Sequence, residues 1–178
     1  MGGKAGDPVV DLVSEHLSPG GTAADLGCGS GRYCGALAGI ASTVYCVDAN
    51  GFPLAIARKR TGSPRAVFLR EDMRSTSIPH SSVDLVLLSR VFHDVRDKGA
   101  VIREILRILR PGGTLMIVEF RPGLSLGGPP PWLRLPPEEV LGHLGEFGRI
   151  EVRDLGRLYA VVARRPWPPP SAPASRTN

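Results

Sequence analysis

A glycine-rich segment directly after a short apolar run is the strongest constraint that this sequence places on its fold. Residues 23–31 read Ala-Ala-Asp-Leu-Gly-Cys-Gly-Ser-Gly, so an acid ends the apolar run and glycine then stands at every second position. Glycine adopts positive φ angles without strain and leaves no side chain between the backbone and a flat ligand. We therefore expect a strand, a tight turn and a helix, with a ligand-binding site at the turn.

Apolar runs alternate with helical spacings along the chain, which predicts a doubly wound α/β fold with a mostly parallel sheet. Helices are expected at residues 7–17, 32–40, 53–61, 97–109 and 136–147. Six strands are expected after the one that precedes the glycines, at residues 43–47, 66–69, 83–88, 114–119, 149–155 and 158–164. Only Gly156-Arg157 separates the last two strands, and such a short turn requires antiparallel pairing. The expected sheet therefore has seven strands and a C-terminal antiparallel hairpin.

The length of 178 residues suits one domain, which we expect over residues 1–165. Residues 166–178 form a proline-rich tail that we expect to be disordered. No apolar run approaches the roughly 20 residues that cross a bilayer, so no membrane contact is predicted. The N-terminus lacks the apolar core of a secretion signal. We therefore expect a cytoplasmic protein.

The cysteines and the net charge argue against two other classes of protein. The three cysteines, Cys28, Cys34 and Cys46, have neither disulfide-framework nor zinc-site spacing, so we predict buried packing residues and no metal. The net charge is +5, but Arg164, Arg165 and Arg176 lie in a C-terminal segment without acids. The remainder is nearly balanced, so nucleic-acid binding is compatible with the composition but not indicated by it.

The spacing of the glycines separates several kinds of nucleotide site. A dinucleotide fingerprint, G-x-G-x-x-G, requires a third glycine where this chain has Arg32 or Cys34. A P-loop requires Gly-Lys-Ser/Thr, which does not follow here. The segment from Asp25 to Gly31 has the pattern acid-x-Gly-x-Gly-x-Gly instead. It resembles the first motif of the class I S-adenosylmethionine-dependent methyltransferases.

Four further segments match this family in order. They are Val47-Asp48-Ala49, Glu71-Asp72-Met73, residues 82–86 with Ser89, and Leu109-Arg110-Pro111-Gly112-Gly113-Thr114-Leu115. The resemblance covers residues 20–120 and is strongest to small type 11-like methyltransferases related to the quinone-biosynthesis C-methyltransferases. It implies a Rossmann-like fold and S-adenosyl-L-methionine as cofactor, with Asp48 on the ribose hydroxyls and Asp72 on the adenine amino group. The cofactor-binding residues that it implies are Asp25, Gly27, Cys28, Gly29, Gly31, Asp48, Ala49, Asp72, Met73 and Ser89.

Methyl transfer from a sulfonium is a direct displacement, so the protein mainly has to align the nucleophile. A general base matters only where the nucleophile must lose a proton. His93 is the first catalytic candidate; it either accepts a proton or contacts the acceptor, or else it caps a helix or packs on the cofactor. Glu119 is the second; it either faces the acceptor or pairs with Arg90 or Arg121. Trp132 either covers the acceptor or is buried under its linker.

The acceptor is expected to be a small molecule. Ser89-Arg90-Val91-Phe92 stands where enzymes that methylate bases or glutamine carry Asn/Asp-Pro-Pro-Tyr. Methylation of a protein or an RNA is one alternative, and a non-catalytic cofactor-binding partner subunit is another, although the intact glycines and Asp48 count against it. Few residues are available to cover the substrate, so we expect an open site, which is explained by a large substrate, by a partner in a homodimer or by a disordered N-terminus.

Overall fold

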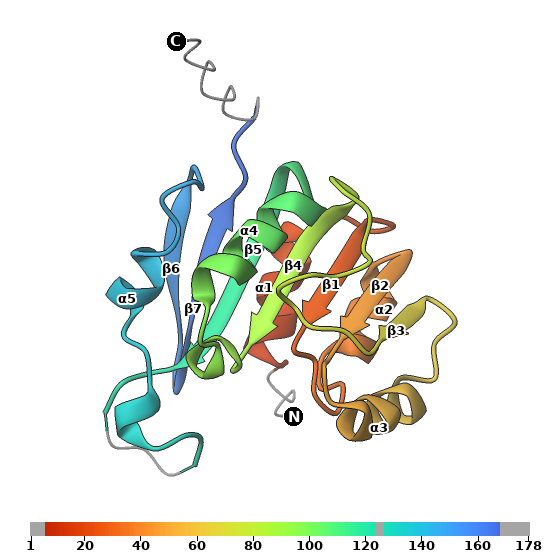
Figure 1. Ribbon diagram of the computed structural model, residues 1–178, viewed down its shortest axis with the longest axis horizontal. Coiled ribbons are helices and arrows are strands. Elements are labelled where there is room, and N and C mark those ends of the chain that lie inside the picture. Colours follow the sequence, from red (N-terminus) through yellow and green to blue (C-terminus); the bar gives the residue numbers. More distant parts are fainter. Residues whose placement is uncertain (1–5, 124–126, 168–178) are drawn as a thin grey trace, which may run out of the picture.

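The computed structural model describes residues 6–123 and 127–167. Its centre is a seven-stranded sheet with the strand order β3-β2-β1-β4-β5-β7-β6 (Figure 1). The strands are β1 (Thr22–Leu26), β2 (Thr43–Val47), β3 (Ala66–Leu69), β4 (Val83–Ser89), β5 (Leu109–Phe120), β6 (Ile150–Leu155) and β7 (Leu158–Arg164). The first five pair in parallel, whereas β7 is antiparallel to β5 and to β6. The predicted fold class is confirmed.

Helices cover both faces of this sheet and form two apolar layers. One layer joins α1 (Pro8–His16), α2 (Cys34–Ile40) and α3 (Gly51–Thr61) to the sheet, and the other joins α4 (Lys98–Ile108) and α5 (Pro137–Leu141). Figure 1 shows α4 in front of the strands and α1 behind them. The central strands β1 and β4 are buried almost throughout, as expected for strands covered on both faces. Within the described ranges, no helix combines the length and the apolar character that a membrane span requires.

Capping residues explain several of the observed helix boundaries. Asp7, Asn50 and Asp97 each accept a hydrogen bond from a backbone N–H in the first turn of α1, α3 and α4, respectively. Such capping satisfies donors that have no partner inside the helix. Gly62 ends α3 in the left-handed conformation, which glycine adopts without strain. The observed starts of these helices therefore follow from local sequence.

The bounds of three expected elements differ from those observed. The strand expected to begin at Thr114 begins at Leu109, because Leu109 pairs with Val83. The pairing with β4 is irregular between Leu109 and Thr114, and Gly112 there has a φ of +76°. The helix expected over residues 136–147 ends at Leu141. Gly142 and Gly145 follow there, and glycine costs a helix interior about 1 kcal/mol relative to alanine. The helix expected from residue 32 begins two residues later, at Cys34.

The end of β7 is anchored to the sheet by Arg164 and Arg165. The Arg165 amide donates to the Gly113 carbonyl, and the Gly112 amide donates to the Arg165 carbonyl. The side chain of Arg165 donates to Ser81 Oγ and to the Leu109 carbonyl. The side chain of Arg164 donates to the Gly112 carbonyl. The last contacts that hold the described chain in place therefore end at Arg165, and most of the predicted tail lies outside the described residues.

Truncation after Arg165 should leave the melting temperature unchanged, because Trp167 is 76% exposed and contributes little burial. Truncation after Ala163 removes the hydrogen bonds of Arg164 and Arg165, each worth about 0.5–1.5 kcal/mol, and should lower the melting temperature by several degrees. Thermal unfolding of the two truncated chains beside the full chain measures the difference. A clear loss of stability in the chain that ends at Arg165 would show that the tail docks on the domain.

Candidate functional site

The order of the strands reverses between β1 and β4, and a ligand site is expected where it does so. In open α/β sheets such a site lies outside the carboxyl ends of the strands at this switch point. Asp25 lies near the end of β1, Asp48 follows β2, Asp72 follows β3 and Ser89 ends β4. These ends share the lower edge of the sheet in Figure 1. The structure thus brings the predicted cofactor residues to one edge.

Neighbouring residues approach the glycine turn after β1 closely at two of its glycines. A Cβ on Gly27 would lie 2.7 Å from Val91 Cγ2 and 2.9 Å from Met73 Cε, and a Cβ on Gly31 would lie 2.7 Å from Ala57 Cβ. Gly29, between them, has a φ of +53° and nothing within 4 Å of its Cβ position. The outer glycines therefore fix the turn, whereas Gly29 leaves open space over the backbone, as a bound ligand would require.

Asp48 ties the glycine turn to the end of β2. Its Oδ2 accepts a hydrogen bond from the Gly29 amide at 2.8 Å, and its Oδ1 accepts one from the Asn50 amide at 2.8 Å. Ala49, which lies between Asp48 and Asn50 in the sequence, is exposed. An ionised carboxylate has about four acceptor sites, so each oxygen of Asp48 can accept one further hydrogen bond. The side chain is placed and hydrogen-bonded as a ribose acceptor requires.

Asp72, after β3, is paired with a nearby arginine. The Arg74 side chain donates to both carboxylate oxygens of Asp72, at 3.0 Å from Nε and at 2.6 Å from Nη2. These hydrogen bonds lower the pKa of the Asp72 carboxyl, so the group is ionised at neutral pH. Met73 turns toward Gly27 and supplies an apolar wall there. Asp72 keeps an acceptor for an amino group, although Arg74 competes for it.

Asp25 is a buried acid beneath the glycine turn. It is 2% exposed, and Cys34 Sγ lies 3.7 Å from its Oδ2. Burial raises the pKa of the Asp25 carboxyl well above its usual value, and the positive charge of Arg90 opposes this shift only in part. Such a group gains from a nearby cation or a strong donor, which the amine of an amino-acid ligand provides.

Three buried thiols lie beside Asp25. Cys28, Cys34 and Cys46 are all free and buried, as predicted. Hydrogen bonds from Cys34 and Cys46 lower the pKa of the Cys28 thiol. Nowhere in the described ranges do three or more His, Cys, Asp or Glu side chains gather into a group that could hold a metal ion. The thiols therefore fill the space under the glycine turn.

Arg90 is a polar residue of this edge whose role sequence reasoning missed. Its φ is +57°, and only one other non-glycine residue of the described chain has a positive φ. Its Nε is buried without a hydrogen-bond partner, and so is Ser89 Oγ beside it. The guanidinium carbon lies 5.9 Å from the centre of the Tyr33 ring. An arginine directly after β4 is the only sequence signal, and the backbone strain shows only in the structure.

The Glu119 carboxylate binds the loop after β4 through hydrogen bonds. It is 1% exposed, and its Oε1 accepts hydrogen bonds from the Phe92 and His93 amides at 2.8 and 3.2 Å. His93 Nδ1 lies 2.8 Å from Glu119 Oε2, and His93 Nε2 lies 3.4 Å from Asp94 Oδ2. The expected pairing of Glu119 with Arg90 or Arg121 is wrong, because Glu119 binds this loop and Arg121 pairs with Asp154.

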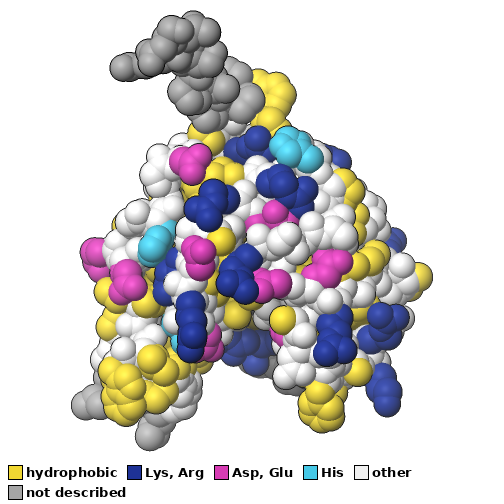
Figure 2. Space-filling view, in the orientation of Figure 1, with side chains coloured by type: hydrophobic (Ala, Val, Ile, Leu, Met, Phe, Trp, Pro, Cys, Tyr) yellow, Lys and Arg dark blue, Asp and Glu magenta, His cyan; other side chains and the backbone are white. Residues whose placement is uncertain are grey.

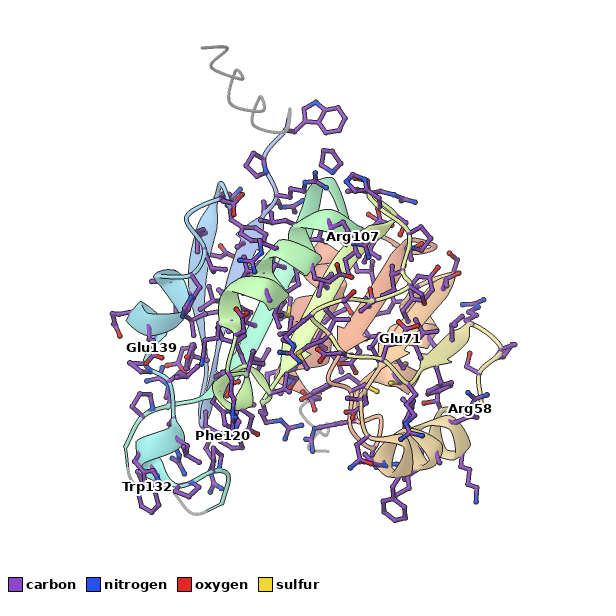
Figure 3. The ribbon with its side chains drawn as sticks, in the orientation of Figure 1. Arg58, Glu71, Arg107, Phe120, Trp132 and Glu139 are labelled. Atoms are coloured by element: carbon purple, nitrogen blue, oxygen red, sulfur yellow. The ribbon has the colours of Figure 1, made fainter. Side chains whose placement is uncertain are left out.

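Two apolar projections flank the same edge of the molecule. Trp132, in the short helix η2 (Pro131–Leu133), is 82% exposed, and Phe52 at the start of α3 is 77% exposed. Figure 2 shows hydrophobic side chains on two separate projections at this edge, with a recess between them. Figure 3 shows Trp132 pointing away from the sheet. The alternative in which Trp132 is buried under its linker is therefore wrong.

These groups fit an adenosyl ligand that carries an amino acid and no phosphate. The ribose hydroxyls, the adenine amino group and the amine of such a ligand are donors, and acids lie at or shortly after the ends of β1, β2 and β3. The open space over Gly29 accepts its flat body. The fold and this edge define an α/β protein with a nucleoside site at the switch point.

Comparison with known proteins identifies the family. A model described as methyltransferase domain matches residues 24–117, more than half of the chain. A structure from Sulfolobus solfataricus assigned to the type 11 methyltransferases is 30% identical, with a TM-score of 0.74, over 83% of this chain and 85% of that one. The chain therefore belongs to this methyltransferase family. It is a class I S-adenosylmethionine-dependent methyltransferase, as predicted.

Two further comparisons agree. A protein of Mycobacterium tuberculosis named as a probable S-adenosylmethionine-dependent methyltransferase is 28% identical over 188 residues, covering 89% of this chain and 68% of its own length. A SAM-dependent methyltransferase from Aquifex aeolicus has a TM-score of 0.80 over 89% of each chain. At 24% identity it supports the fold alone.

Gly29→Val should weaken binding of S-adenosylhomocysteine at least 10-fold, because a branched side chain would fill the open space over the turn. Gly20→Val is the matched control: Gly20 also has a positive φ and open space, but it precedes β1 at the other end of the sheet. Both variants should lose similar stability, and only Gly29→Val should lose affinity in calorimetry. Equal affinity in the two variants would place the cofactor elsewhere.

Asp25→Asn should raise the melting temperature of the cofactor-free protein at neutral pH. Burial raises the pKa of Asp25 in the folded state, so the folded protein binds more protons than the unfolded chain above about pH 4. The folded protein therefore loses stability as the pH rises above about 4. The side-chain amide of the Asp25→Asn variant carries no such proton, so the variant does not have this loss. The gain should grow as the pH rises above about 4, the usual pKa of an aspartate. A pH-independent difference would contradict a raised pKa of the buried Asp25 carboxyl.

Proposed function

We propose that this enzyme transfers a methyl group to a small organic acceptor by direct displacement. The observation that carries the proposal is the form of the loop after β4. Residues Phe92–Asp94 form a 3-10 turn that Glu119 holds against β5. The Ser89-Arg90-Val91-Phe92 segment that leads into this turn stands where enzymes that methylate bases or glutamine carry Asn/Asp-Pro-Pro-Tyr.

The surroundings of the recess suit an organic acceptor. Phe52 and Trp132 supply exposed apolar surface on its two sides, and exposed apolar patches at a rim commonly mark ligand or partner sites. The described segment between β5 and α5 is short, so the acceptor side stays open to a molecule larger than the recess. These features support a small-molecule acceptor with apolar parts.

When bound, S-adenosyl-L-methionine supplies an electrophilic methyl group on a sulfonium with a good leaving group. We propose that Gly27, Cys28, Gly29 and Gly31 support the cofactor through their backbone, and that Asp48 and Ala49 hold its ribose. The adenine lies against Asp72 and Met73, after β3. Ser89 lines the site where β4 ends, and the Asp25 carboxyl faces the amine of the cofactor. Alignment is the main contribution of these residues to the rate, since positioning alone can remove several kcal/mol from a barrier.

His93 serves this alignment through the loop that it holds. Both of its ring nitrogens face carboxylates, and its side chain is only 6% exposed. A direct displacement from a sulfonium proceeds without a base when the nucleophile carries no proton that must leave. We therefore propose that His93 and Glu119 are positioning residues that set the path of the chain after β4.

Activity is tested by incubating the protein and methyl-labelled S-adenosylmethionine with three fractions of a cell extract: small molecules, proteins and RNA. Label should appear in the small-molecule fraction. Label in protein or RNA instead would favour a macromolecular acceptor. Tight binding of S-adenosylhomocysteine with no transfer to any fraction would favour a non-catalytic partner subunit. The Gly29→Val variant is the control in each assay.

Two coarser features belong to the same proposal. We propose that residues 1–165 form one domain, since a single sheet and its two apolar layers account for the described residues up to Arg165. We also propose that the protein acts in the cytoplasm, a reducing compartment in which free thiols such as the three described here persist.

His93→Ala should lower the melting temperature and the affinity for S-adenosylhomocysteine together, because the change frees Glu119 Oε2 from its partner. The single-turnover rate at saturating cofactor should fall less than about 10-fold. A general base contributes about 10²–10⁴-fold. A rate loss of at least 10²-fold with unchanged cofactor affinity would therefore make His93 a catalytic base.

A further inference from the structure

Arg90 combines two energetically unfavourable features at the edge where the cofactor binds. A positive φ strains a residue with a Cβ, typically by about 1–3 kcal/mol. A buried N–H donor without an acceptor is also costly, more so on a charged group. No salt bridge to Arg90 occurs among the described residues, in contrast to Arg74, Arg110 and Arg121. Such a residue fits a site whose missing partner is a ligand.

The surroundings of Arg90 point to an anion beside the glycine turn. The guanidinium lies over the ring of Tyr33, which follows Gly31 by two residues. Its charge also acts on the buried carboxyl of Asp25, at the end of β1. An acid and an unpaired arginine thus lie near each other under the same turn, as the amine and the carboxylate of one amino acid require.

We propose that Arg90 binds the carboxylate at the amino-acid end of the cofactor and makes the site selective for ligands that carry it. The inference rests on cofactor binding at this edge. A guanidinium presents a planar fork of donors that matches a carboxylate, and its charged hydrogen bonds are among the stronger ones in proteins. The buried Nε then gains an acceptor, and the strained backbone is the cost of aiming the side chain at it.

A carboxylate on the acceptor is the other source of the same chemistry. The position of Arg90 favours the cofactor, because Tyr33 and Asp25 belong to the turn and strand on which the cofactor lies. If Arg90 binds the cofactor carboxylate, its substitution weakens only those cofactor analogues that carry this group. If it binds an acceptor carboxylate, the affinity for the cofactor does not change.

The experiment measures binding of S-adenosylhomocysteine and of its decarboxylated analogue, which differ only in the carboxylate, to three proteins. The wild-type chain should bind the first about 10- to 100-fold more tightly, the range for hydrogen bonds to a charged group. Arg90→Met should lose this preference by weakening S-adenosylhomocysteine alone. Arg32→Met is the matched control: Arg32 also lies over the Tyr33 ring, at 5.6 Å, but it is paired with Asp7. It should keep the preference.

Arg90→Gly adds a readout that does not depend on a ligand. Glycine adopts the positive φ without strain, so the cofactor-free variant should melt at the wild-type temperature or above it. A structural Arg90 would instead lower the melting temperature. The same variant should bind S-adenosylhomocysteine as weakly as Arg90→Met does.

The outcomes separate this inference from the proposed function. Equal weakening of both ligands by Arg90→Met, or loss of the preference in Arg32→Met instead, would overturn the role of Arg90 while leaving the cofactor site in place. An unchanged affinity for S-adenosylhomocysteine with a raised KM for an anionic acceptor would assign Arg90 to the acceptor. Failure of the wild-type chain to bind either ligand would count against the proposed site itself.

Discussion

Contacts that glycine alone permits hold the turn after β1, and the rest of the site is built around that turn. Val91 and Met73 approach Gly27 from the loops after β4 and β3, and Ala57 approaches Gly31 from α3. Three separate elements are thereby brought against one short stretch of backbone. A methyl group at either glycine would push them apart. The path of the turn depends on these approaches, and the hydrogen bond from the Gly29 amide to Asp48 joins the turn to the end of β2.

The sequence was most informative where function and local structure depend on the same residues. The glycines, Asp48 and the run before Ser89 act through short-range geometry, so their spacing predicted both the strand ends and the cofactor. The start of β5 depends instead on pairing with Val83 and on hydrogen bonds from Arg165, far along the chain. Pro111-Gly112-Gly113 alone looks like a break between helix and strand. Tertiary pairing overrides that local signal.

The polar residues at this edge also divide into those that local sequence predicts and those that only the tertiary fold places. Asp48 was predicted because its motif is short and its role needs only a strand end. The binding of Glu119 to the Phe92–His93 backbone was missed, because it joins β5 to the 3-10 turn after β4, and only the sheet order places these two strands side by side. Arg90 was passed over for another reason. Its strain and its unpaired Nε arise from the fold, and an arginine in sequence usually indicates a solvated side chain.

The two halves of the site differ in how firmly the fold determines them. On the cofactor side, buried or hydrogen-bonded groups take their positions from four parallel strands, and the unfavourable burial of Asp25 and strain of Arg90 are kept at the same edge. Rigid strands are needed to maintain such groups, since a flexible loop would relax them. Trp132 and Phe52, by contrast, project from a short helix and a helix end, and most of each side chain is exposed. Side chains of this kind can be exchanged with little effect on the core, so the surface around the proposed acceptor site can vary while the buried half of the edge is kept.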